Sequence, residues 1–293
     1  MKNRSRLWYA AIAVLVFAFV DQYNYFLKLI GWKRFISEWL IVLGIRNAFE
    51  VATAFVAVAI THRLGFKRAA RELGMLAPMG RGLAFAAIAT LPMLITFAFT
   101  MPVNPNMTFL TVGVLCFIAP FAEEVLYRAF MFRQLYRRAK LGFWVSALVP
   151  SAIFATMHLY QSDNFMEQLG IVAITGTGGI GFCWFFLKWR DNLWAVFGLH
   201  AGMNLWWEVF AVDDTALGGW LANGARLATV IVAVLLTIYK DKIWKPLPSE
   251  AENIDINGSE KKAGGRAKKV AHRWLDSGLD VVGCAPREGG FRG

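Results

Sequence analysis

Charge and cysteine are both scarce in this sequence. Charged residues make up only 17% of the 293 residues, below the roughly 25% that is usual for soluble domains. The three cysteines, Cys116, Cys183 and Cys284, are odd in number and far apart, which excludes a disulfide framework and a Cys-x-x-Cys metal site. Hydrophobic residues reach 57%, with 24 Phe and 12 Trp, and the mean hydropathy is +0.46. This composition excludes a disordered or collagen-like chain and requires lipid to cover much of the apolar surface.

Apolar stretches of about 20 residues, the length that a helix needs to cross a bilayer, recur along the first 240 residues. We therefore predict an all-α membrane protein, a polytopic bundle of about eight transmembrane helices. The predicted spans are Leu7–Leu27, Trp39–Ile60, Gly82–Phe99, Met107–Met131, Leu141–Tyr160, Leu169–Trp189, Leu193–Val212 and Arg226–Tyr239. No small-residue cleavage site follows the first span, so we interpret it as a retained helix and not as a secretory signal.

The net charge of +11 reflects basic residues that gather on alternate sides of these spans. The N-terminus, the segment before Gly82, the segment Arg128–Lys140, the loop Lys188–Asn192 and the residues after Tyr239 carry most of the 31 Lys and Arg. The positive-inside rule then places both termini in the cytoplasm, and we expect the cell (plasma) membrane.

Composition divides the chain into a transmembrane domain, residues 1–240, and a basic cytoplasmic tail, residues 241–293, which we expect to be disordered. The tail lacks interleaved aromatic residues and any known nucleic-acid module, so we expect the lipid bilayer as a partner and no nucleic acid.

Ionisable residues inside apolar spans are costly and are candidates for function. Arg46 and Glu50 lie four residues apart in the second predicted span and can pair on one face of the helix. No nucleophile or metal ligand is near them in sequence, so a structural role is preferred.

Two adjacent glutamates, Glu123 and Glu124, stand in the fourth predicted span, with Arg128 one turn after Glu124. Adjacent residues on a helix point about 100° apart. Arg128 can therefore neutralise Glu124 while Glu123 faces elsewhere and remains free to act as a base.

Histidines occur in two later spans. Phe154 and His158 lie one turn apart near the end of the fifth, and His200 and Asn204 share one face of the seventh. At ~1.5 Å per residue these side chains and Glu123 can meet at a similar depth. This requires the fourth helix to extend to about Arg138, with a bend that Pro120 can supply.

The motifs Glu-Glu-x-x-x-Arg, Phe-x-x-x-His and His-x-x-x-Asn, in this order on successive helices, resemble those of the CPBP family. This family comprises CAAX proteases and bacteriocin-processing enzymes and includes the type II CAAX prenyl endopeptidases. The resemblance covers roughly Met107–Phe210, which we take as a catalytic core at 107–210. The matching residues are Glu123, Glu124, Arg128, Phe154, His158, His200 and Asn204.

The resemblance implies an intramembrane endopeptidase that hydrolyses a peptide bond of a membrane-associated protein or peptide, with CAAX-type prenylated proteins as the family's name-giving substrates. Glu123 and His158 would activate a water molecule. His200 and Asn204 would stabilise the oxyanion. The remaining motif residues, Glu124, Arg128 and Phe154, would support the site.

The cofactor remains open at this point. The set Glu123, His158 and His200 suits a catalytic zinc with one open position. The chain has no His-Glu-x-x-His motif, however, and Asn204 is a poor zinc ligand. A mechanism that requires no cofactor is preferred, with zinc as the alternative.

Two other functions remain as alternatives. A non-catalytic membrane scaffold or regulator of the same fold would use the polar residues for packing, but it leaves Glu123 without a purpose. An ion-coupled transporter would use them as a relay, but the sequence has neither paired broken helices nor an internal repeat. The run Gly176–Gly181 formally matches a nucleotide-binding pattern, yet it lies inside an apolar span, where close helix packing is the better interpretation.

Overall fold

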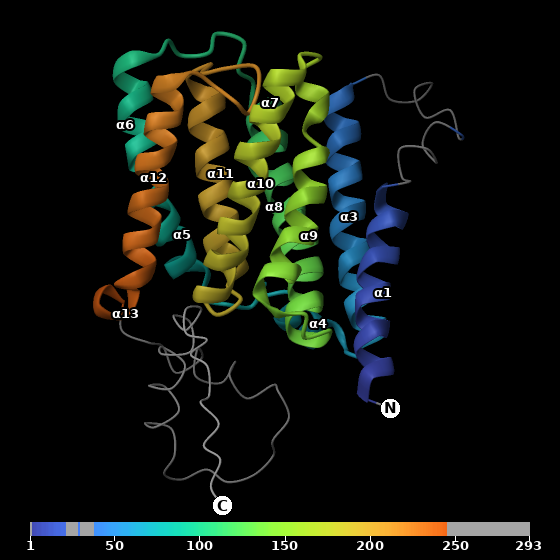
Figure 1. Cartoon of the computed structure of the whole chain (residues 1–293). Helices are drawn as coiled ribbons and strands as arrows, with labels where there is room; N and C mark the ends of the chain where they lie inside the picture. Colours follow the sequence, from blue (N-terminus) through green and yellow to red (C-terminus); the bar gives the residue numbers. More distant parts are fainter. Residues whose placement is uncertain (1, 22–28, 30–37, 245–293) are drawn as a thin grey trace, which may run out of the picture. The chain divides into compact units, whose positions relative to one another are not determined.

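The computed structural model describes residues 2–21, 29 and 38–244, and every regular element in these ranges is helical (Figure 1). Within these ranges, six helices are long and apolar enough to cross a membrane: Trp39–Thr61, Met79–Thr100, Phe109–Arg138, Gly142–Gln161, Phe165–Lys188 and Trp220–Ile238. The chain is therefore an all-α integral membrane protein. Residues 245–293, which hold nearly all of the predicted tail, lie outside the described part of the chain.

Six of the eight predicted spans correspond to helices that are long and apolar enough to cross a membrane. The first predicted span corresponds to α1 (Lys2–Asp21), whose apolar stretch Arg6–Val20 is shorter than a membrane crossing. Its predicted last residues, 22–27, lie outside the described residues. The seventh corresponds to α11 (Leu193–Val209), which has 17 residues. For these two helices, crossing of the membrane stays a prediction.

The helices alternate in direction along the bundle (Figure 1). After α1, the elements are α3 (Trp39–Thr61), α4 (Phe66–Glu72), α5 (Met79–Ala89), α6 (Leu91–Thr100), α7 (Phe109–Thr111), η2 (Val112–Ile118), α8 (Ala119–Glu123), η3 (Glu124–Phe132), η4 (Gln134–Arg138), α9 (Gly142–Thr156), η5 (Leu159–Gln161), α10 (Phe165–Lys188), α11, α12 (Trp220–Ile238) and α13 (Lys240–Ile243).

The segments from α7 to η4 form one continuous helix, Phe109–Arg138, which we call the long helix. It reaches Arg138, as the depth argument requires. Its geometry is not uniformly α-helical, because η2, η3 and η4 are π-helical. Pro120 occupies the start of α8, directly after the first π-helical segment. Extra residues in π-helical turns shift the side chains that follow them around the helix.

Small residues let the helices that carry the motifs approach closely. A Cβ atom added to Gly202 would lie 3.0 Å from Thr90, the residue that follows α5, so α11 packs tightly on the C-terminal end of α5. A Cβ atom added to Gly179 would lie 2.7 Å from the Ser151 hydroxyl, so α10 packs tightly on α9. This contact supports the packing interpretation of the glycine run.

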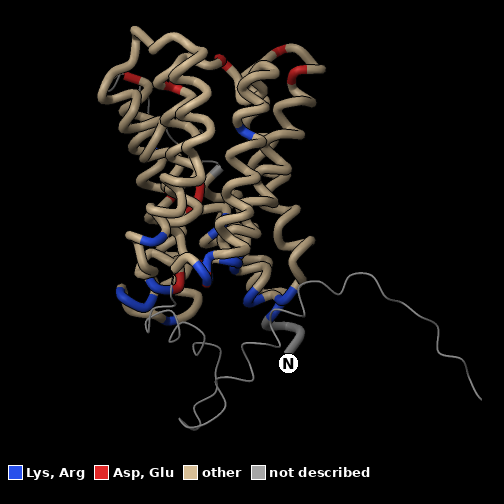
Figure 2. Tube along the Cα trace, turned by 90° about the vertical axis from the view of Figure 1, so that its left-hand side faces the viewer, with Lys and Arg blue, Asp and Glu red and all other residues tan. Residues whose placement is uncertain are grey.

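Lys and Arg gather at one end of the bundle, which we call the basic end (Figure 2). The start of α1 and the end of α12 lie at this same end (Figure 1). Three arginines of the long helix meet two carboxylates of neighbouring segments there. Arg133 pairs with Glu72 and, at 3.0 Å, with Asp191; Arg137 pairs with Asp191 at 3.1 Å, and Arg138 with Glu72 at 2.7 Å. We call these five residues the basic-end network.

The basic-end network controls the protonation of Glu72. Burial of this carboxyl would raise its pKa, but Arg133 and Arg138 outweigh burial and hold the pKa below the ordinary value of 4.5. The network joins α4, the end of the long helix and the α10–α11 loop. It therefore fixes the basic end of the helices that carry the motifs.

Candidate active site

The buried centre of the site is an ion pair on the long helix. Arg128 Nη1 lies 2.9 Å from Glu124 Oε1, and the two side chains are 3% and 0% exposed. The pairing predicted from their spacing is confirmed. A charge buried to this extent is stable only with a partner, so each of the two residues depends on the other.

His200, on α11, connects both glutamates. Its Nδ1 lies 2.8 Å from Glu124 Oε1, and its Nε2 lies 3.7 Å from Glu123 Oε2. A carboxylate paired with an arginine accepts hydrogen bonds, so Nδ1 is the donor here. The second ring nitrogen, Nε2, is thereby directed at Glu123.

Glu123 differs from its neighbour in environment. Its side chain is 27% exposed, and its one ion-pair contact in the described structure is the 3.7 Å approach to His200. No arginine neutralises it within that part of the chain. The separation of Glu123 from Arg128 agrees with its position beside Glu124, and its role as a base stays a prediction.

Aromatic rings enclose the arginine and the histidine of this cluster. The Arg128 guanidinium lies 4.8 Å from the ring centre of Phe154 and 5.2 Å from that of Phe182. Both rings also contact His200, at 6.3 and 5.6 Å between centroids. Phe154 has the supporting position that the motif implies. Phe182 was not predicted, because one more phenylalanine in an apolar span carries no distinguishing signal.

His158 also packs against Phe154. Its ring centroid is 4.5 Å from that of Phe154, and its Nδ1 lies 2.7 Å from the Phe154 carbonyl oxygen. A carbonyl only accepts, so Nδ1 donates and the neutral ring keeps an acceptor lone pair on Nε2. Across the described residues, no hydrogen bond or ion pair joins His158 to Glu123.

Asn204 is held by the long helix. Its Nδ2 donates a hydrogen bond of 3.2 Å to the carbonyl oxygen of Leu115 in η2. This hydrogen bond is part-buried and joins α11 to the long helix. The structure thus brings Glu123, Glu124, Arg128 and His200 into one cluster and places Phe154 against it. His158 and Asn204 stand at its border, each bound to a backbone carbonyl.

The predicted zinc ligands do not form a ligand set in this arrangement. In the described ranges, no group of three or more His, Cys, Asp or Glu side chains is placed to hold a metal ion. Glu123 and His200 face each other at 3.7 Å, but no hydrogen bond or ion pair joins His158 to either of them in the described residues. As placed, these three residues do not form a zinc site.

A polar pair on α3 borders the cluster. Arg46 Nε lies 2.8 Å from Glu50 Oε1, which confirms the predicted pairing. Both side chains interact electrostatically with Glu123. The pair, interpreted from sequence as structural, therefore contributes to the field at the candidate base.

A groove with a volume of about 420 Å³ lies between α3, the long helix and α11. Such a volume falls within the range of roughly 300–1,000 Å³ that is usual for ligand sites. Its lining residues are mostly apolar: Asn47, Ala48, Val51, Phe117, Ile118, Phe121 and Phe197. Phe117 and Ile118 are 43% and 44% exposed, so the groove is bordered by the outer surface of the bundle.

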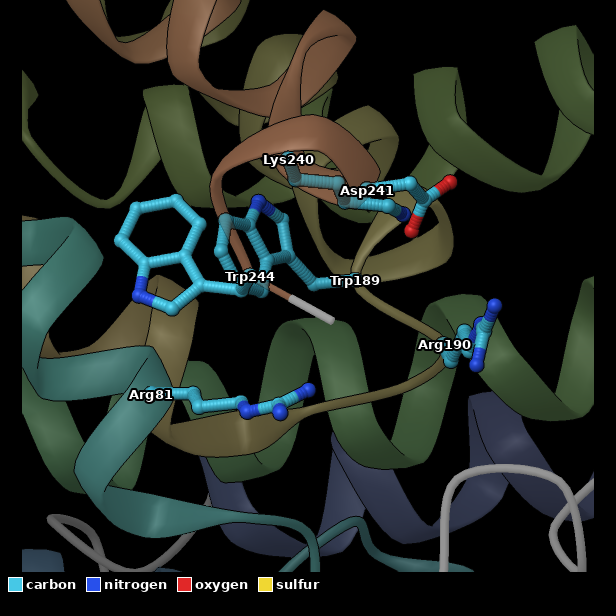
Figure 3. Close-up of a pocket in the computed structure, with 6 residues that line it drawn as sticks. All are labelled: Arg81, Trp189, Arg190, Lys240, Asp241 and Trp244. Carbon is cyan, nitrogen blue, oxygen red and sulfur yellow. The ribbon is translucent and has the colours of Figure 1, made fainter. Parts of the chain in front are cut away.

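A second hollow lies at the basic end (Figure 3). It is lined by Arg81, Trp189, Arg190, Lys240, Asp241 and Trp244. None of the motif residues lines it. Trp189 there donates to Thr237 and joins α10 to α12, so this hollow belongs to the packing of the basic end.

The comparison with protein families agrees with the three motifs. Residues 105–206 match the model of the family described as type II CAAX prenyl endopeptidase Rce1-like. The match confirms the resemblance predicted from the sequence and covers all seven motif residues. It indicates a protease whose substrate is associated with the membrane. Neither the curated proteins nor the solved structures give a match.

Proposed function

We propose that this chain is an intramembrane endopeptidase in which Glu123 is the general base. The observation that carries the proposal is the contrast between two adjacent carboxylates. Glu124 is fully buried and paired with Arg128, whereas Glu123 is partly exposed and faces only His200. A structural pair explains the first carboxylate and leaves the second available for catalysis. The family match over residues 105–206 supports this choice of chemistry.

Glu123 and His158 activate the water in this proposal. Water placed at Glu123 gives a proton to its carboxylate, and the Nε2 lone pair of His158 accepts a hydrogen bond from the same water. The hydroxide attacks the carbonyl carbon of the scissile bond. Glu123 then returns the proton to the departing amine, so the carboxylate is regenerated as the peptide bond breaks.

His200 and Asn204 stabilise the oxyanion. His200 donates to the oxyanion from Nε2, the ring nitrogen that lies nearest to Glu123. Its Nδ1–H remains bound to Glu124 while its Nε2–H faces the substrate. Asn204 has two amide hydrogens, of which one binds Leu115, and the second is available to the substrate. The preferred mechanism requires no cofactor.

The apolar groove beside Phe121 receives the substrate. It borders the long helix two residues before Glu123 and is lined by apolar side chains with one amide, that of Asn47. A membrane-associated peptide can enter it without passing through water. We propose substrates of the CAAX type, with a prenylated cysteine near the C-terminus, because the matched family is named for that class.

We place the protein in the cell membrane with both termini in the cytoplasm. The gathering of Lys and Arg at the basic end supports this orientation (Figure 2). The basic end would then face the cytoplasm.

The test is cleavage of a farnesylated peptide with a C-terminal Cys-a-a-X sequence, reconstituted in liposomes with wild-type protein or with Glu123→Gln. We expect cleavage by the wild type and a loss of about 10²–10⁴-fold in the variant. Equal cleavage by both would contradict the assigned base. No cleavage by either folded protein would favour the scaffold function, and an unprenylated peptide tests the substrate class.

A further inference from the structure

The Leu115 carbonyl lies just before the two glutamates, where the hydrogen-bond pattern of the long helix changes from π to α. In η2 the π-helical pattern joins an N–H to the carbonyl five residues earlier, as in the bond from Ala119 N to Val114 O. One residue further, the same pattern would join residue 120 to Leu115. Residue 120 is proline, which has no N–H, so Leu115 lacks this donor.

Asn204 of α11 supplies that donor. Its Nδ2 lies 3.2 Å from the Leu115 oxygen. An unpaired backbone carbonyl is unfavourable in the bilayer core, so the bond is favoured there. It also fixes the amide plane of Asn204, because the carbonyl belongs to a rigid helix. One turn before Asn204 on α11 lies His200, which faces Glu123.

We propose that Pro120 is a positioning residue of the active site: by leaving the Leu115 carbonyl free, it provides the acceptor that orients the Asn204 amide. This inference rests on the proposed function of Asn204 as an oxyanion donor. With one amide hydrogen bound to Leu115, the direction of the second is set before substrate arrives. Preorganised donors of this kind are the efficient ones, because they need no reorientation during the reaction.

The competing account is that Pro120 acts only on the shape of the long helix. Two replacements at position 120 separate the accounts. Alanine adds an N–H that can bond to Leu115 and displace Asn204. Lactic acid, introduced by nonsense suppression, has the same side chain but an ester oxygen in place of the N–H. Both remove the proline ring, and only alanine adds a competing donor.

The kinetic test uses the farnesylated peptide in liposomes. We expect Pro120→Ala to lower kcat about tenfold and to leave KM unchanged. This loss is smaller than that expected for complete removal of an oxyanion donor, because Asn204 is misoriented and not removed. The lactic acid variant should retain the wild-type kcat. In an Asn204→Leu background, Pro120→Ala should have no further effect. Equal losses with alanine and lactic acid, or an undiminished effect of Pro120→Ala in the Asn204→Leu background, would overturn the inference.

Pro150 is the matched control, since it is a buried proline inside α9. Pro150→Ala should change kcat by the same factor with Asn204 present or absent. A dependence on Asn204 as strong as that of Pro120 would show that the coupling is not specific to Leu115, and it would overturn the inference.

Thermal unfolding in detergent tests the hydrogen bond without any cleavage. Asn204→Leu leaves the Leu115 carbonyl unpaired and should lower Tm by about 2–4 °C. In the Pro120→Ala background the new N–H satisfies that carbonyl, so the same substitution should cost clearly less. Equal losses in both backgrounds would overturn the inference even if the protein is active. Coupled losses in a folded protein that cleaves nothing would instead contradict the proposed function.

Discussion

Two charged clusters lie on the long helix and differ in how completely their carboxylates are neutralised. In the basic-end network, Glu72 and Asp191 each contact two arginines. In the candidate active site, Glu124 contacts one arginine and one histidine, whereas the one ion-pair contact of Glu123 among the described residues is the 3.7 Å approach to Nε2 of that histidine. The same helix thus holds one cluster with excess positive charge and one without it.

The difference separates structural charge from reactive charge. A carboxylate held between two guanidinium groups is a poor base, because protonation would break both pairs. A carboxylate without a guanidinium partner, beside a histidine and close to an apolar groove, can accept a proton from water. We therefore propose that the basic-end network holds the helices in place and that Glu123, which has no arginine partner among the described residues, carries the chemistry.

The largest effect is expected from Arg128→Ala. It leaves Glu124 buried without its cation, which typically costs about 3–5 kcal/mol, and it removes the contacts with Phe154 and Phe182. Thermal unfolding and cleavage should both be impaired. Arg128→Lys, which keeps the charge but loses the planar stacking, should recover part of the stability. An Arg128→Ala protein with wild-type Tm would show that Glu124 is not a buried charge.

His200→Ala comes next. It removes an oxyanion donor, and we expect kcat to fall by about 10²–10³-fold. His62 is the control histidine, because it contacts Gln134 at 2.9 Å and stacks on Tyr9 away from the motif residues. His62→Ala should retain the wild-type kcat. Comparable kcat losses in the two variants would contradict the role assigned to His200.

A smaller effect concerns pH and belongs to the basic-end network. The folded pKa of Glu72 is held below its ordinary value of 4.5, so its ion pairs contribute stability above that value. This contribution is lost as the pH falls through the lower folded pKa. Wild-type Tm should therefore drop as the solution is acidified below about pH 4.5. Glu72→Gln should lower the free energy of unfolding at neutral pH by about 1–3 kcal/mol, and therefore also Tm. The Tm of this variant should change less than that of the wild type when the solution is acidified. An unchanged dependence would contradict the pairing.

The smallest expected effect is that of chelation. With no metal in the proposed mechanism, EDTA or 1,10-phenanthroline should leave cleavage of the farnesylated peptide unchanged. Magnesium and zinc additions serve as controls. Loss of cleavage on chelation that zinc alone restores would establish a metal-dependent site.

Much of the fold follows from the sequence because hydrophobic length is a local property. Six spans are found near their predicted positions, and the extension of the long helix to Arg138 followed from matching depths. The boundaries moved where polar residues continue an apolar helix. The last span, predicted from Arg226, begins at Trp220, because Arg226 bonds to Asn223 and to the Ala216 carbonyl.

The site was predictable where spacing along one helix decides contacts. The pairs Glu124–Arg128 and Arg46–Glu50 both form. Contacts between helices depend on rotation and register, which no local pattern fixes. The bond from His200 to Glu124, the ring of Phe182 on Arg128 and the bond from Asn204 to Leu115 belong to this class. For Pro120, the sequence alone predicts only a bend of the helix.

The most direct measurement compares Glu123→Gln with Glu72→Gln for both Tm and cleavage of the farnesylated peptide. The account predicts opposite outcomes. Glu123→Gln should keep the wild-type Tm, because its side chain has no close ion pair, and should lose cleavage. Glu72→Gln should lower Tm and retain kcat at temperatures where it remains folded. Cleavage by Glu123→Gln at the wild-type rate would contradict the claim that the unpaired carboxylate carries the chemistry.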